Sequence, residues 1–375
     1  MKKSLWLITL VALCILTCSC GQKEQQLELP TYERITESQL EYGEIETGNI
    51  GGDYIYGVST DDILIKYHIP SGTATWVCQD PFCAHDYVNC PFAVSPSQYA
   101  AMGNVLYYVK KTDDGRRSLR AYDGDSMQVE EIRVSDGVIS RLFTYNYYLY
   151  FSESESSDGG LINTVIYRWD TQTDAFDVID CGHPYAKINK IEIGRIVWEQ
   201  GEKVFSTDLN GEDERAYNQT YQREWGKYVY RWDYDYDKQE FSRLYRKDLT
   251  TGEEILIGQN MFCFYFYGDK VLYFKYTDTP RYVTSDAGTQ MKDKFGGNVY
   301  IMNSDGTNDH LLCHVDDFYF MGMSSRRNNE FVCGDWVGIM ATNSYSESGG
   351  IDTTDKLFVN VVTEEYKLIK FNPYE

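Results

Sequence analysis

The sequence has little positive charge. Its 375 residues include 57 Asp and Glu but only 35 Lys and Arg, which gives a formal net charge of -22 at pH 7. A surface of this sign repels the phosphate backbone of nucleic acids and, for the same reason, anionic lipid headgroups. We therefore expect no nucleic acid partner, while cations, basic proteins and neutral ligands stay open. The simplest interpretation of the acidic excess is solubility.

The sequence also lacks the short motifs that identify common enzymes. It contains no His-Glu-x-x-His zinc motif, no Gly-x-Ser-x-Gly nucleophile elbow and no Gly-rich phosphate-binding loop. Carboxylates are abundant enough to include a glycosidase pair. Such a pair is defined by the separation of its carboxyl groups in space, so the sequence cannot select it. The catalytic residues of any enzymatic activity are therefore unknown at this stage.

The hydrophobic run at the start of the chain, residues 5–16, is shorter than the roughly 20 residues that a membrane-spanning helix needs. It follows two lysines and has the length of a signal-peptide core. The next residues, Leu16-Thr17-Cys18-Ser19-Cys20-Gly21, resemble the lipobox of bacterial lipoproteins. The resemblance implies a signal peptide over residues 1–20 and a diacylglyceryl group on Cys20. Thr17 departs from the usual Leu, and Cys18 is the alternative anchor. An ordinary secretory signal is the simpler alternative.

Residues 21–41 are rich in Gln and Glu and contain few apolar side chains. Such a segment cannot bury enough surface to fold, so we interpret it as a flexible tether. Two or more acyl chains hold a protein on a membrane for a long time, whereas a single chain does so only marginally. We therefore predict a lipid-anchored protein on the extracytoplasmic face of the cell membrane, with its folded domain in residues 42–375.

Aromatic residues are unusually frequent. The chain contains 33 Tyr, 17 Phe and 7 Trp, which together make up 15% of its residues. Tyr and Trp favour β-strands because they pack well on a pleated, half-buried surface. We therefore predict a mostly β protein.

One pattern recurs along the folded domain: two or more apolar or aromatic residues, usually an Asp, then a turn and a second strand. Its copies end at positions 68, 123, 170, 208, 248, 303 and 361. Each copy reads as a hairpin, and earlier strand-like runs bring the unit to four strands. A four-stranded unit repeated about seven times predicts an all-β fold, a β-propeller of seven four-stranded blades. Six or eight blades are the alternatives. Packing between blades would explain the aromatic content.

Three cysteines and one histidine lie close together in the sequence: Cys78, Cys83, His85 and Cys90. Thiolates and imidazole together suit tetrahedral zinc, although the spacing matches the usual zinc modules only in part. A disulfide between two of the cysteines is a second interpretation for an exported protein. A third is that Cys78 is a small buried residue, because Cys181 and Cys313 stand at the same distance from their own repeat positions.

Two resemblances follow from these segments. The repeat copy over residues 299–308 resembles the repeat of TolB-like propellers. The whole chain resembles the propeller lipoproteins of anaerobic Gram-positive gut bacteria, which share its lipobox, tether, repeats and cysteine segment. The resemblance implies a cell-surface location and a propeller, and it implies no activity.

These observations predict a membrane-anchored extracellular lipoprotein. Its propeller would be a monomeric, non-enzymatic binding or scaffold module for a protein or a glycan. The alternative is a carbohydrate-active hydrolase or lyase, because propellers also host such enzymes and the fold cannot separate the two. Cys181 with His183, and His310 with His314, are weaker ligand pairs that we expect to be surface or turn residues.

Overall fold

The computed structural model describes residues 50–59, 61–95, 98–157, 160–192, 194–217, 222–225, 227–235, 240–261, 263–267, 269–276, 282–284, 290–292, 297–315, 319–320, 332–342 and 356–371. The predicted signal peptide, Cys20 and the predicted tether lie outside these residues. The described residues form β-strands and turns, with no α-helix among them. In particular, this part of the chain holds no helix with the length and hydrophobicity needed to cross a membrane.

The described strands build seven antiparallel sheets of three to five strands, each from one continuous stretch of chain. The first sheet has three strands: β1 (Tyr54–Val58), β2 (Leu64–His68) and β3 (Thr73–Trp76). The second contains β4 (Tyr99–Met102), β5 (Val105–Lys111), β6 (Arg117–Asp123) and β7 (Val129–Ser135). The third contains β8 (Val138–Tyr145), β9 (Tyr148–Ser157), β10 (Gly160–Asp170) and β11 (Ala175–Ile179). The fourth contains β12 (Lys187–Glu192), β13 (Arg195–Gln200), β14 (Lys203–Asp208) and β15 (Arg215–Ala216).

The remaining sheets are less regular. The fifth contains β16 (Gln222–Trp225), β17 (Tyr228–Asp235), β18 (Glu240–Asp248) and β19 (Glu254–Met261). The sixth contains β20 (Cys263–Tyr267), β21 (Lys270–Tyr276), β24 (Gly297–Asn303) and β25 (His310–Val315). A separate hairpin of β22 (Tyr282–Thr284) and β23 (Gln290–Lys292) is inserted between β21 and β24. The seventh contains β26 (Tyr319–Phe320), β27 (Val332–Cys333), β28 (Trp336–Thr342), β29 (Lys356–Asn360) and β30 (Tyr366–Ile369).

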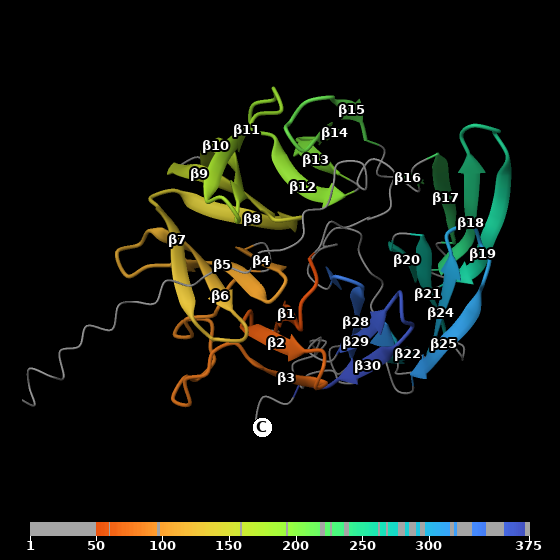
Figure 1. Ribbon diagram of the computed structural model, residues 1–375, viewed down its shortest axis with the longest axis horizontal. Helices are drawn as coiled ribbons and strands as arrows, with labels where there is room; N and C mark the ends of the chain where they lie inside the picture. Colours follow the sequence, from red (N-terminus) through yellow and green to blue (C-terminus); the bar gives the residue numbers. More distant parts are fainter. Residues whose placement is uncertain are drawn as a thin grey trace, which may run out of the picture.

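The seven sheets follow one another around a ring in the order of the sequence (Figure 1). Successive strands of a sheet are hydrogen-bonded neighbours, which is the arrangement of strands in a propeller blade. The fold is therefore an all-β propeller, as the repeats predict. The number of blades in the complete chain stays a prediction, because segments between the sheets lie outside the described residues.

The repeat has a structural meaning, because its polar residue ends the third strand of each four-stranded sheet. β6, β10, β14 and β18 end in Asp, and β24 ends in Asn. In the four Asp copies, the side-chain Oδ1 accepts backbone N–H groups of the following turn at 2.7 to 3.2 Å. Asp favours turns through such bonds, so these recurring carboxylates shape the hairpin to the fourth strand.

The seventh copy was predicted to end at Val361, and this register is wrong by one residue. The strand β29 ends at Asn360, whose Oδ1 accepts the N–H groups of Val362 at 3.0 Å and Thr363 at 2.8 Å. Val361 is the first residue of the turn, and its side chain is buried. A buried turn residue continues the hydrophobic pattern, so the sequence alone does not show where this strand ends.

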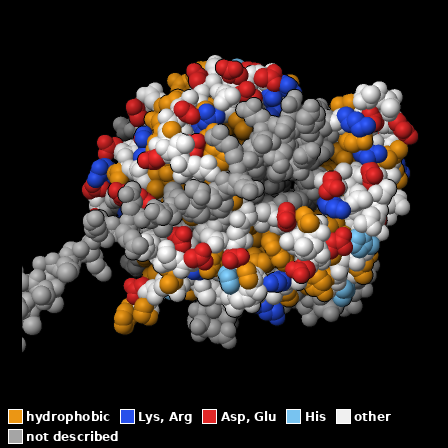
Figure 2. Space-filling view, in the orientation of Figure 1, with side chains coloured by type: hydrophobic (Ala, Val, Ile, Leu, Met, Phe, Trp, Pro, Cys, Tyr) orange, Lys and Arg blue, Asp and Glu red, His pale blue; other side chains and the backbone are white. Residues whose placement is uncertain are grey.

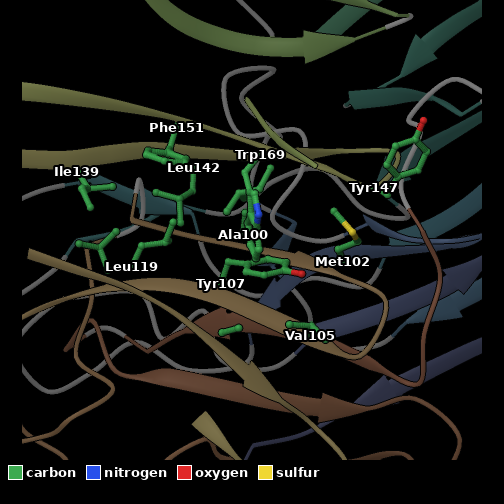
Figure 3. Close-up of a cluster of buried hydrophobic side chains, with 13 residues drawn as sticks. Ala100, Met102, Val105, Tyr107, Leu119, Ile139, Leu142, Tyr147, Phe151 and Trp169 are labelled. Atoms are coloured by element: carbon green, nitrogen blue, oxygen red, sulfur yellow. The ribbon is translucent and has the colours of Figure 1, made fainter. Parts of the chain in front are cut away.

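Neighbouring sheets pack through aromatic and aliphatic side chains. Figure 3 shows one such core between the second and third sheets, where Tyr107 of β5 lies against Trp169 of β10. Their ring centroids are 5.7 Å apart, and the rings meet edge to face at 89°. This arrangement adds attraction beyond the burial of apolar area. Aromatic side chains therefore serve packing between sheets, in agreement with the expectation from composition.

The first and last sheets lie side by side and close the ring (Figure 1). Tyr67 of β2 packs on Phe358 of β29, with ring centroids 5.4 Å apart. Lys367 Nζ, on β30, donates to the carbonyl oxygen of Ile69 at 2.7 Å. Just before β1, the N–H of Gly52 donates to Sγ of the buried Cys333 at 3.0 Å. Among the described residues no sheet mixes strands from the two ends of the chain, so these contacts close the ring without strand exchange.

Candidate metal centre

The cysteine–histidine segment lies in the connection between β3 and β4. Both ends of this loop are fixed to the start of β2. The N–H of Val77 donates to the carbonyl oxygen of Leu64 at 3.1 Å. The N–H of Leu64 donates to the carbonyl oxygen of Phe92 at 3.0 Å. An isolated bridge between Ile63 and Ala93 adds a second fixed point. The loop therefore leaves and returns at the same edge of the first sheet.

Two aspartates shape the loop between these ends. The carbonyl oxygen of Asp80 accepts the N–H of Cys83 at 3.1 Å, and that of Asp86 accepts the N–H of Cys90 at 3.0 Å. The Asp86 carboxylate also accepts the N–H and side-chain amide of Asn89, and these hydrogen bonds hold the pKa of Asp86 below its usual value. Each Asp therefore starts a turn that positions the cysteine several residues later.

The turns bring together the four side chains that the sequence singled out. The ligand atoms of Cys78, Cys83, His85 and Cys90 all lie within 4.8 Å of one another, and we call this group the Cys3His cluster. The thiols of Cys78 and Cys90 are buried, whereas Cys83 and His85 are half-buried. These three cysteines, together with Cys181, Cys313 and Cys333, are free thiols.

His85 is held in an uncommon conformation. Its φ is +50°, in the left-handed region that non-glycine residues rarely adopt. Its backbone N–H donates to Sγ of Cys83 at 3.4 Å, and its ring stacks on Trp76 with centroids 5.0 Å apart. Its Nδ1 is buried and has no hydrogen-bond partner among the described residues. A buried polar atom without a partner is costly, so this nitrogen suits a ligand.

Burial controls the electrostatics of the cluster. It raises the pKa of the Cys78 thiol and raises the pKa of Cys90 to about 12. Lys110 of β5 approaches from the second sheet, and its Nζ donates to the carbonyl oxygen of Cys90 at 2.7 Å. Burial lowers the pKa of Lys110, while the nearby Cys90 acts in the opposite direction. Sequence reasoning missed Lys110 and Trp76, because only the folded chain brings them to the loop.

The weaker ligand pairs do not assemble into metal sites. His310 Nε2 lies 2.9 Å from the Glu364 carboxylate, and His183 Nε2 lies 2.6 Å from that of Glu214. Cys313 is buried in the core between the last two sheets, which agrees with a small apolar role. Within the part of the chain that the structure describes, the Cys3His cluster alone groups three or more His, Cys, Asp or Glu closely enough to hold a metal ion.

Comparison with known proteins bears on the fold alone. No family model and no curated protein matches the sequence. Similar solved structures include TolB from Acinetobacter baumannii, at 13% identity and a TM-score of 0.33, covering 71% of this chain and 62% of TolB. An uncharacterized protein from Listeria monocytogenes has 11% identity and a TM-score of 0.44, over 74% of this chain and 84% of its own. An oligogalacturonate lyase from Vibrio parahaemolyticus has 12% identity and a TM-score of 0.39, over 88% of this chain and 97% of the lyase chain.

The chain spans less than two thirds of the TolB chain. The identities and TM-scores are too low to carry any inference about activity, and the lipoprotein character and the bacterial source stay predictions.

Proposed function

We propose that the protein is an exported lipoprotein, held at the extracytoplasmic face of the cell membrane through Cys20, whose propeller binds a protein partner without catalysing a reaction. One observation carries the binding part of the proposal. The loop of the Cys3His cluster presents three large apolar side chains to solvent: Phe82 is 95% exposed, Val88 83% and Tyr87 56%. Exposed apolar side chains gathered on one loop mark contact surfaces.

The conformation of the loop supports this role. The N–H of Phe82 donates to Oδ1 of Asp80 at 2.9 Å, and the N–H of Val88 donates to Oδ1 of Asp86 at 3.0 Å. The exposed side chains therefore stand on turns that are already ordered, which lowers the entropy lost on binding. Two of the three exposed side chains, Phe82 and Val88, carry no polar group, so an apolar protein surface suits the tip better than a glycan.

The acidic side chains do not favour the enzymatic alternative. The Asp residues that end β6, β10, β14 and β18 accept backbone N–H groups in turns. Among the described residues on the face drawn in Figure 2, the Asp and Glu side chains lie scattered. The four carboxylates that end these strands therefore have a role in turns, and no catalytic role is needed to explain their presence. The carbohydrate-active hydrolase or lyase stays an alternative with no observation of its own.

Photocrosslinking on intact cells tests the binding proposal. A photoreactive amino acid at position 82 is expected to give one adduct of defined mass with a cell-surface protein, and Val88→Ser should reduce its yield severalfold. The matched control carries the same amino acid at position 362, because Val362 is also exposed, at 66%, but lies on the turn after β29. Equal adducts from both positions, or adducts with lipid alone, would overturn the proposal.

Lipid labelling tests the anchor separately. Cells grown with a radiolabelled or clickable fatty acid should label the wild-type chain, and Cys20→Ser should abolish labelling and shift the chain from the membrane to the soluble fraction. Cys18→Ser is the matched control, because it removes the neighbouring thiol and should keep both the label and the membrane location. Loss of label in Cys18→Ser with retention in Cys20→Ser would assign the anchor to Cys18. A wild-type chain without label would exclude a lipoprotein.

A further inference from the structure

The Cys3His cluster has the composition and the closeness of a metal site. Its four ligand atoms lie within 4.8 Å of one another. Two thiolates bound to one tetrahedral zinc, each about 2.3 Å from the ion, are about 3.8 Å apart. An adjustment of about 1 Å in a loop without strands therefore brings the four atoms to the distances of a zinc site.

We propose that Cys78, Cys83, His85 and Cys90 together bind one Zn²⁺ ion. Three thiolates and an imidazole are ligands that zinc prefers, whereas calcium and magnesium prefer oxygen. The four side chains fill all four tetrahedral positions, so no position is left for water or substrate. The ion therefore has a structural role, and it is distinct from the partner binding proposed above.

A disulfide within the loop explains fewer of the observations. It would join two of the three thiols and make no use of His85. Yet the His85 ring is stacked on Trp76, and its buried Nδ1 has no hydrogen-bond partner among the described residues. A metal ion bound through the imidazole would give this nitrogen the partner that a disulfide does not supply.

The charges around the cluster fit a bound metal. Three thiolates and one Zn²⁺ carry a net charge of -1, which is costly in a partly buried place. The Lys110 ammonium is hydrogen-bonded to the carbonyl oxygen of Cys90 at 2.7 Å and supplies the opposite charge. The N–H of His85, which points to Sγ of Cys83 at 3.4 Å, also stabilises a thiolate there.

A bound metal would add to the stability that the turns of the loop already provide. Among the described residues between Trp76 and Tyr99 there is no strand, and the apolar residues packed at the base of the loop are few, with Ile63 and Ala93 beside the cysteines. Binding energy at structural zinc sites acts as folding energy. Zinc at the base of the loop would therefore fix the exposed Phe82 and Val88 at its tip.

The test measures metal content and thiol state in the full chain, purified from membranes in detergent without reductant or chelator. We expect one zinc per chain by elemental mass spectrometry, and less than a tenth of that in Cys83→Ala and in His85→Ala. Replacing zinc with Co²⁺ should produce a thiolate-to-cobalt charge-transfer band, which reports cysteine ligation directly. Circular dichroism shows whether each variant keeps its β structure.

Two controls separate ligation from damage to the fold. His85→Cys replaces one zinc ligand with another and should keep the metal, whereas His85→Ala should lose it. Cys313→Ala removes a buried cysteine outside the cluster and should keep one zinc per chain. A metal-free chain whose intact mass is lower by two hydrogens would establish a disulfide and overturn the proposal. Zinc that persists in both alanine variants of the cluster would place the metal elsewhere and overturn it too.

Discussion

Single residues join neighbouring sheets through a few polar contacts, and the pair of His310 and Glu364 is an example. His310 begins β25 in the sixth sheet, and Glu364 lies in the turn between β29 and β30 of the seventh. The imidazole contacts the carbonyl oxygen of Asn308 through Nδ1 at 2.8 Å and the Glu364 carboxylate through Nε2 at 2.9 Å. These two hydrogen bonds raise the pKa of His310 above its usual value.

This raised pKa predicts a pH-dependent contribution to stability. A histidine whose pKa is higher in the folded chain stabilises fully below the unfolded pKa, and the contribution is lost as pH rises through the folded value. Between pH 6 and pH 8, the free energy of unfolding of the wild type should fall relative to that of His310→Gln. The expected fall is roughly 0.5 kcal/mol or less, because solvent screens this partly exposed pair. Urea unfolding of both chains at the two pH values measures it. Glu364→Gln should remove part of the same difference, because the hydrogen bond to the Asn308 carbonyl, the larger cause of the raised pKa, stays in place. An unchanged difference would contradict the pairing.

At this scale the sequence could identify candidate ligands but not their surroundings. Cys78, Cys83, His85 and Cys90 are close in the chain, so their grouping was visible from spacing alone, and the structure brings their ligand atoms together. Lys110 reaches the cluster from another sheet, and Glu364 lies far along the chain from His310. Such contacts depend on the placement of whole strands, which spacing does not show.

Among the elements, the turn before the last strand of each of the seven sheets has a backbone feature in common. Each such turn contains at least one residue of positive φ, and the first of these in each turn are Gly72, Met127, Asp174, Gly211, Gly252, Gly306 and Glu364. Glycine adopts this conformation without the steric cost that a β-carbon brings. Four of the seven turns use it. Glycine therefore occurs in the turns of some copies of the repeat and not in others.

A substitution at Gly252 can measure how much the left-handed backbone of such a turn costs in stability. Its φ is +75°, and a β-carbon added there would meet no atom within 4 Å. Gly252→Ala should therefore destabilise the protein by about 1 kcal/mol through the left-handed backbone alone. Gly72, with φ at +70° and equally open space, is the matched position and should give the same loss. Thermal or urea unfolding of the two variants checks this, and a neutral effect at both would show that the turns adjust.

The predicted ends of six of the seven repeat copies, at positions 68, 123, 170, 208, 248 and 303, coincide with strand ends. The copy ending at Asp248 and the copy ending at Asn303 coincide with the ends of β18 and β24. The inserted β22–β23 hairpin, between two strands of one sheet, was not predicted, since an insertion between paired strands leaves the repeat on either side intact. Val361 misled for a different reason, because the buried side chain belongs to a turn.

On the scale of the whole molecule, the ring is completed where the first described residues meet the last sheet. Gly51 and Gly334 approach so closely that a β-carbon on Gly334 would lie 2.8 Å from Cα of Gly51. Next to them, the N–H of Gly52 donates to Sγ of Cys333. Nothing in the repeat pattern predicts this contact, because it joins residues about 280 positions apart and uses glycines outside the repeated turns.

Gly334→Ala should therefore disturb the closure of the ring. It combines a φ of +55° with a backbone contact that cannot move easily. We expect a loss of stability at least about 1 kcal/mol greater than that of Gly252→Ala, which shares the left-handed backbone but lacks the contact. Differential scanning calorimetry of both variants makes the comparison. Equal losses would mean that the two glycines have room to separate.

The way the ring closes has a mechanical consequence. Every described sheet consists of strands from one stretch of chain, and backbone hydrogen bonds between these strands hold it together. The seam between first and last sheets is held instead by contacts such as Tyr67 with Phe358 and Lys367 with Ile69. In a protein pulled by its amino end, tension enters beside Gly51, at this seam. The seam would therefore yield before any single sheet, and the ring would part there while its blades stayed whole.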